Sequence, residues 1–174
     1  MLYRDLEAYK RYTMSSNFDS SFQFMPPKMF EITPLDSLLA ATRHAFENEK
    51  MSLEIKGMDY KSKGKMKIKK AKIYHWVFVP YDMTMRIGLK GDSAFKTLFT
   101  KMLKSEYGSE NIQEEGESAL LLTEKNKRMI AYKDPASPIW FFLEDKRGKA
   151  SDQETELLFY HVIPIEVQEA VGKQ

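Results

Sequence analysis

The side chains of this sequence that could do acid–base chemistry are three histidines and the carboxylates near them. The histidines lie at positions 44, 75 and 161, and this spacing fits no metal-ligand pattern, so we expect no metal site. His75 stands among apolar residues at alternate positions, where it is either a general base for a ligand or a core histidine bonded to one polar neighbour. Asp82 and His161 are the nearest candidates for its catalytic partner, although Asp82 also suits a turn.

The composition excludes several other chemistries. The chain has 174 residues and no cysteine, which excludes a disulfide scaffold, an iron–sulfur site and a thiol nucleophile. It contains no glycine-rich phosphate loop, serine nucleophile elbow or dinucleotide fingerprint, so we expect no cofactor. The length suits a single domain over residues 1–174. No apolar run is long enough to span a bilayer, and no export signal is visible, which indicates the cytoplasm by default; an exported protein given without its signal segment is the alternative.

The net charge of +2 hides two segregated charge runs. Residues 61–72 hold seven lysines and no acid, whereas residues 106–117 hold five acids and no base. The lysine run could attract phosphates or an acidic partner, but it has no arginine, which argues against nucleic acid. Its alternation also fits the solvent face of a strand. We interpret the acidic run as a loop.

Helical spacing of apolar residues predicts helices at the two ends of the chain and one between strands. We expect helices at residues 2–14 and 35–46, with Thr33 as N-cap of the second, and a broken helical stretch at 17–32. Asp92 should cap an inserted helix over 92–107 that ends at Gly108. Pro164 should open a short terminal helix.

Alternating hydrophobicity predicts strands between these helices. The segment 65–79 reads as one strand whose apolar phase changes near Lys69-Lys70, which predicts a β-bulge and a strongly curved sheet. Residues 80–82 should form a turn before a strand at 83–87. Further strands are expected at 118–123 and 128–132, joined by a turn at 124–127, and at 139–143 and 157–163. Helices first and a mainly antiparallel sheet afterwards indicate an α+β fold.

Several degenerate motifs make the chain resemble a known superfamily. They are the proline-containing segment 24–30, the helix at 35–46 and the segments 74–81, 140–143 and 162–167. With these motifs the chain resembles the nuclear transport factor 2-like (SnoaL-like) superfamily, and more narrowly uncharacterised bacterial members of it. The resemblance implies a cone-like fold with a ligand pocket between helices and curved sheet, and homodimerisation through the sheet. That superfamily contains isomerases, cyclases and non-enzymatic binding modules, so the fold does not decide the function.

The strand around His75 supplies the candidate pocket and the candidate interface. We expect Ile73, His75 and Val77 to face inward and to line an apolar ligand pocket with Trp140. Tyr74, Trp76 and Phe78 should lie on the opposite face, either as a protein–protein surface or packed across strands against Trp140 or Phe142 of the same subunit.

The function favoured by these patterns is a non-catalytic small-molecule-binding or protein-interaction module with an apolar pocket, forming a homodimer and taking an apolar small molecule. A small isomerase- or cyclase-type enzyme using His75 with a carboxylate is the alternative. A third hypothesis is a protein that docks an anion or a partner through the lysine run 61–72.

Overall fold

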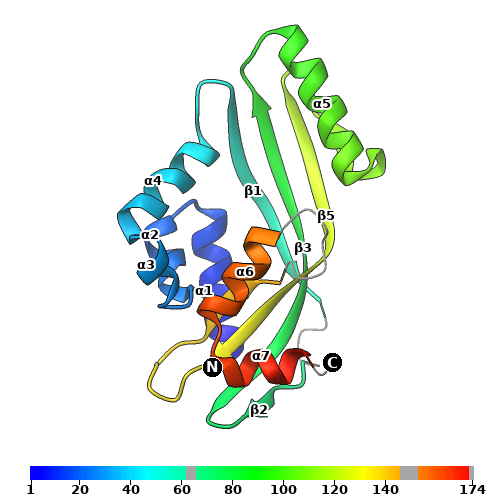
Figure 1. Cartoon of the computed structure of the whole chain (residues 1–174). Helices are drawn as coiled ribbons and strands as arrows, with labels where there is room; N and C mark the ends of the chain where they lie inside the picture. Colours follow the sequence, from blue (N-terminus) through cyan, green and yellow to red (C-terminus); the bar gives the residue numbers. More distant parts are fainter. Residues whose placement is uncertain (62–65, 146–152, 173–174) are drawn as a thin grey trace.

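The computed structural model describes residues 1–61, 66–145 and 153–172. Figure 1 shows an α+β fold in which N-terminal helices pack on a curved, six-stranded antiparallel sheet. One helix, α5 (Ser93–Tyr107), is inserted between the third and fourth strands. The predicted fold class is therefore confirmed.

The N-terminal helices follow the predicted boundaries closely. They are α1 (Leu2–Met14), α2 (Phe18–Ser21), the 3-10 turn η1 (Phe22–Phe24), α3 (Met29–Ile32) and α4 (Leu35–Phe46). Asn17 caps α2 by accepting a hydrogen bond from the Ser20 N–H at 3.2 Å. The prediction of Thr33 as the cap of α4 is wrong, because Pro34 occupies the capping position and no side chain bonds to that end.

The sheet is organised around two long strands, β3 (Tyr74–Leu89) and β5 (Ala119–Lys133), which pair along almost their full length. The outer edge of β3 is paired by β1 (Met51–Tyr60) and β2 (Lys69–Ala71) at different levels. The outer edge of β5 is paired in the same way by β4 (Ile112–Glu114) and β6 (Phe141–Glu144). Both long strands are therefore central in the sheet.

The phase change at Lys69-Lys70 is a hairpin rather than a bulge. Ala71 pairs with Tyr74, so that Lys72 and Ile73 form a two-residue turn between β2 and β3. Lys72 adopts a left-handed φ of 51°, a conformation usually taken by glycine or asparagine. Because lysine is unusual in such a turn, the sequence pattern did not indicate a hairpin here. The apolar pattern changes phase because one strand ends and another begins.

The expected hairpin turn at 124–127 is instead a β-bulge within the continuous strand β5. Between the pairs Tyr81–Lys127 and Met83–Glu124, β5 has one more residue than β3. Asn126 takes the left-handed φ of 57° that this extra residue requires, and its N–H donates to Asp82 Oδ1 at 2.9 Å. The predicted turn at 80–82 is also wrong, because β3 runs straight through it.

Two further segments differ from the prediction. The acidic run contains a 3-10 turn, η2 (Ser109–Asn111), and strand β4, so it is not a simple loop. The predicted strand at 157–163 lies mostly in α6 (Gln153–Val162). Phe159 and Val162 of α6 pack in the same buried cluster as Ile163, which follows the helix, and their spacing is helical. The terminal helix α7 (Ile165–Gly172) forms as expected after Pro164.

Both faces of the sheet are covered at the Trp76 end of β3. On one face Val77 and Val79 pack with Leu2 and Leu6 of α1. On the other face Trp76, only 1% exposed, packs with the C-terminal helices and strands β5 and β6, through residues that include Ile130, Phe141, Phe159, Val162 and Val167. At the far end of the sheet a third cluster packs under α5 (Figure 1). Trp76 is therefore buried by residues of its own chain and is not exposed for a partner.

The bulge makes a prediction about backbone strain at Asn126. Replacement of Asn126 by Gly should leave stability within a few tenths of a kcal/mol, because glycine adopts a positive φ without steric cost. Replacement by Val should lower the free energy of unfolding by about 1–3 kcal/mol, because a β-branched residue is strained there. Urea unfolding measures both. Equal stability of the Val and Gly variants would contradict the bulge.

Candidate functional site

The residues predicted to line one apolar pocket do not share a site. Val77 and Trp140 are both buried in the cluster under α1. Ile73 is 60% exposed in the β2–β3 turn, and His75 is exposed on the sheet surface. The prediction that these four residues line one pocket is therefore wrong, because Ile73 lies in a turn and not in a strand.

The space between α1 and the sheet, where the pocket was expected, is a small cavity of about 160 Å³. Burial raises the pKa of Tyr9 and Tyr81 at its wall, so both hydroxyls remain neutral. Close by, Lys127 Nζ lies 2.8 Å from a carboxylate oxygen of Glu124 and 2.8 Å from one of Glu144, with only 7% of its side chain exposed. These ion pairs join Glu124 and Lys127 of β5 to Glu144 of β6. The cavity itself is smaller than typical ligand pockets, which begin at about 300 Å³.

A larger cleft of about 420 Å³ lies where the corner between α6 and α7 meets the sheet. We call it the aromatic cleft. Four rings come to it from four elements, β3, β5, β6 and α6, with four ionisable side chains around them. The rings are Tyr74, Tyr132, Phe141 and Tyr160, and the ionisable groups are Lys28, Asp134, His161 and Glu166.

The rings of the aromatic cleft are held by one another and by the helix corner. The Tyr132 ring centroid lies 6.3 Å from that of Tyr74, edge-on, and 5.4 Å from that of Phe141. Gln168 Nε2 donates to the carbonyl oxygens of Tyr160 at 2.9 Å and Ile163 at 2.6 Å, which fixes the bend between α6 and α7. These contacts preform the aromatic wall of the cleft.

The hydroxyls of Tyr74 and Tyr132 in the cleft are neutral donors. Burial, followed by the negative charge of Asp134, raises the pKa of both Tyr74 and Tyr132. Glu166 raises the pKa of Tyr74 further, and Tyr74 raises the pKa of Tyr132 further, so the two hydroxyls share one electrostatic environment. A neutral tyrosine presents both an apolar ring and a hydrogen-bond donor to a ligand.

Nearby hydrogen-bond donors and cations largely offset the negative charge of the two carboxylates in the cleft. A backbone N–H at the start of α7, and then Lys72 at 3.3 Å and Lys28, lower the pKa of Glu166. Asp134 Oδ1 accepts a hydrogen bond from the Ala136 N–H at 2.8 Å. With Lys28 also at the rim, the cleft carries no strong excess of either charge.

The three candidate catalytic residues lie apart. His161 lines the aromatic cleft, in the last turn of α6. His75 lies on the sheet beside Lys70 and Lys133. Asp82 lies in the middle of β3, where Lys61 Nζ is 2.6 Å from its carboxylate. Asp82 stabilises the bulge of β5 by accepting the hydrogen bond from the Asn126 N–H. Within the described residues no hydrogen bond joins Asp82 to either histidine.

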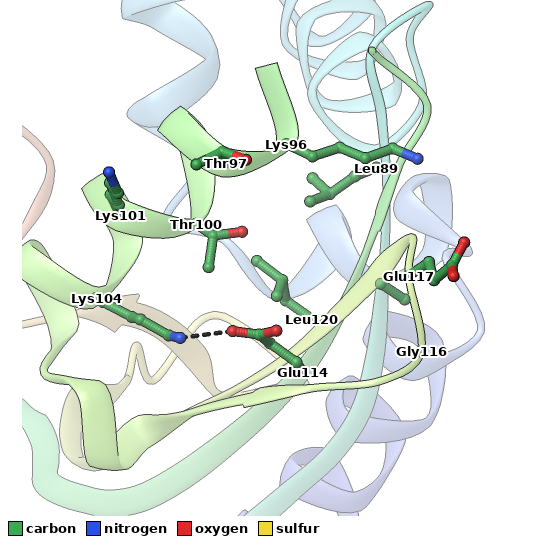
Figure 2. A pocket seen from close by; sticks show the side chains of 11 residues that line it. Leu89, Lys96, Thr97, Thr100, Lys101, Lys104, Glu114, Gly116, Glu117 and Leu120 are labelled. Atoms are coloured by element: carbon green, nitrogen blue, oxygen red, sulfur yellow. Dashed lines mark hydrogen bonds and ion pairs between the residues drawn. The ribbon is translucent and has the colours of Figure 1, made fainter. Parts of the chain in front are cut away.

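A second cleft of about 330 Å³ lies between α5 and the β4–β5 turn. Leu89 and Leu120 form its floor, and Lys104 Nζ reaches Glu114 Oε1 across it at 2.6 Å (Figure 2). Figure 2 shows Lys101 and Glu117 pointing away to opposite sides. This cleft is a weaker site for a ring-containing ligand than the aromatic cleft, because its described lining contains no aromatic side chain and the Lys104–Glu114 ion pair crosses it.

Of the residues that line the aromatic cleft, the sequence indicated Tyr74 only as an interface residue and His161 only as a catalytic candidate. Tyr132, Asp134, Phe141 and Tyr160 were not predicted as site residues. The signal that could have found Tyr160 is the helical spacing of Phe159, Val162 and Ile163, which places Tyr160 beside a buried face. No local pattern joins Asp134 in a turn to a helix that begins about twenty residues later.

The fold and its clefts define an α+β protein with an aromatic surface cleft at its C-terminal helices. Comparison of the chain with protein-family models, curated proteins and solved structures gives no match in any of the three. The resemblance to the nuclear transport factor 2-like superfamily therefore stays a prediction. In the described ranges, no group of three or more His, Asp or Glu residues is placed to hold a metal ion, and no helix is long and apolar enough to cross a membrane.

The position of Asp82 predicts a pH-dependent contribution to stability. Hydrogen bonds from Lys61 and from the Asn126 N–H lower the pKa of Asp82 in the folded protein. Its stabilising effect is therefore complete above the unfolded pKa of about 4 and is lost as pH falls through the lower folded value. Asp82→Ala should cost about 1 kcal/mol at pH 7, because the Asn126 N–H loses its acceptor.

Urea unfolding from pH 7 to pH 2.5 tests this assignment. The difference between the parent and Asp82→Ala should shrink in acid, and Asp82→Asn should keep part of the stability because its amide oxygen still accepts from Asn126. A difference that stays constant down to pH 2.5 would argue against the charged role of Asp82.

Proposed function

We propose that this protein is a non-catalytic binding module that holds a small molecule with an apolar ring or chain in the aromatic cleft. The observation that carries the proposal is the convergence of four aromatic side chains on a cleft of about 420 Å³. A cleft of this size, with an apolar wall and a few polar groups, is typical of small-molecule sites.

The polar groups of the cleft define what the ligand should carry. Within the described part of the chain, no hydrogen bond to the Tyr74 or Tyr132 hydroxyl contributes to its raised pKa. Both hydroxyls are therefore available to donate, while Asp134 and Glu166 offer acceptor oxygens. The near balance of charge favours a neutral ligand with one or two hydroxyl or amide groups beside its apolar part.

The absence of an assembled acid–base pair favours binding over catalysis. A general base must lie within hydrogen-bond reach of the proton it removes and must be oriented by a partner. In the described residues His161 makes no hydrogen bond or ion pair with Asp134 or Glu166, although all three line the cleft.

An isomerase- or cyclase-type enzyme remains the second candidate function. One observation favours it, namely that His161 and two carboxylates face the same cleft. In that function the catalytic histidine would be His161 rather than His75, which lies outside the cleft. His161→Gln separates the two functions, because a binding module tolerates this change and an acid–base catalyst does not.

The binding test uses three probes: phenol, cyclohexanol and methyl β-glucoside. Each is titrated into protein carrying ¹³C-labelled tyrosine, and the tyrosine ring signals are followed by NMR. We expect at least one probe to bind with a dissociation constant of about 1 mM or tighter, which is within reach of a well-buried fragment. Tyr160→Ala should weaken that probe about three- to tenfold by removing one ring contact, and His161→Gln should leave it unchanged.

Leu98→Ala is the matched control, because Leu98 is an apolar side chain that is 70% exposed on α5, far from the aromatic cleft (Figure 1). It should leave every probe affinity as in the parent. Saturation by none of the probes, or equal losses in the Tyr160 and Leu98 variants, would overturn the proposal.

A further inference from the structure

The β2–β3 hairpin presents isoleucine and lysine together at one end of the molecule (Figure 1). Ile73 in its two-residue turn is 60% exposed, and Ile68 just before β2 is 50% exposed. Turns of this kind normally carry glycine, asparagine or aspartate. An exposed β-branched residue beside a left-handed lysine is therefore unfavourable for folding alone and suggests a contact with something outside the chain.

Lysine side chains surround these two isoleucines. Lys67, Lys69, Lys70 and Lys72 are all exposed. Lys69 Nζ lies 5.3 Å from the Trp76 ring centroid, and Lys72 Nζ lies 3.3 Å from Glu166 Oε1. Lys67 and Lys70 make no ion pair within the described ranges.

The strand register adds a row of basic side chains across the sheet. Lys70 pairs with His75, and His75 pairs with Lys133 on β5. Basic residues at directly opposed positions destabilise a sheet when they are charged, unless an anion lies near them. Helix α7 packs against β2 and β3 from the Trp76 side, and its Glu166 pairs with Lys72. Asp134 follows Lys133 directly after β5 and acts electrostatically on Tyr74.

Anionic lipid is the partner that fits both features of the hairpin. Nucleic acid would use the lysines but gives no reason for the exposed isoleucines. A stable protein partner requires a continuous interface of about 1,000 Å² or more, whereas two separated isoleucines among lysines offer little apolar area. The interfacial layer of a bilayer accepts short apolar side chains flanked by cations.

We propose that the β2–β3 hairpin docks this protein onto an anionic lipid surface. Ile73 enters the headgroup layer, and Lys67, Lys70 and Lys72 face the lipid phosphates. The site consists of Ile68, Ile73 and the three lysines Lys67, Lys70 and Lys72. It adjoins the aromatic cleft, which Tyr74 and Glu166 line, but none of these five residues lines that cleft, so the proposal stands whether or not the cleft binds a ligand.

Vesicle co-sedimentation of the full chain tests the proposal. The probes are vesicles of pure phosphatidylcholine and vesicles in which about a third of the lipid is phosphatidylglycerol. We expect binding to the anionic vesicles only, weakened strongly at about 0.5 M salt because the lysine attraction is screened. Lys70→Ala should reduce the vesicle partition coefficient about fivefold, and Ile73→Ser should reduce it at least threefold at constant charge.

Leu98→Ser and Lys101→Ala on α5 are the matched controls, because both residues are exposed and lie at the other end of the long strands. They should leave vesicle binding unchanged. The proposal is overturned if anionic vesicles are not bound at low salt, or if the control variants lose as much binding as the hairpin variants. Binding to duplex DNA that Ile73→Ser leaves intact, without vesicle binding, would also overturn it.

Discussion

The burial of β3 on both faces at its Trp76 end is the constraint on which the other features of this structure depend. Val77 and Val79 require cover on one face, and Trp76 requires cover on the other. Helix α1 supplies the first layer, and α6 with α7 supplies the second. Two short helices joined at Pro164 cover this face, and their corner leaves a gap beside Tyr74 and Tyr132. That gap is the aromatic cleft.

The other half of the sheet depends on two register shifts beside β3. One lies at Asn126 in β5, and the other lies between Ile55 and Gly57 in β1. Extra residues of this kind increase the local twist and bend a sheet. Strands β3 and β5 can therefore leave the helical layers and continue to α5, where a separate apolar cluster forms around Ile87, Leu103 and Leu122. The β2–β3 hairpin and α5 therefore lie at opposite ends of the molecule (Figure 1).

The sequence was sufficient to predict the elements that have strong local signals. The Asp92 cap and Gly108 end of α5 were predicted because both act through nearby backbone groups. The turn at Lys72 and the bulge at Asn126 were misassigned, because both use left-handed residues other than glycine, and only strand pairing distinguishes a turn from a bulge. Residues 157–163 were predicted as a strand because a short apolar run fits either structure until its partners are known. The aromatic cleft was not predictable, since Tyr74, Asp134 and Tyr160 meet only through the tertiary fold.

The central claim is that the α6–α7 corner completes a ligand site with the tyrosines of β3 and β5. Intermolecular nuclear Overhauser effects between a bound ring probe such as phenol and the ¹³C-labelled tyrosines test it most directly. Contacts from the probe to the ring protons of Tyr74 and Tyr160 are the predicted result. At a saturating probe concentration, contacts only to Tyr107, the last residue of α5, or no contact to any tyrosine, would contradict this claim.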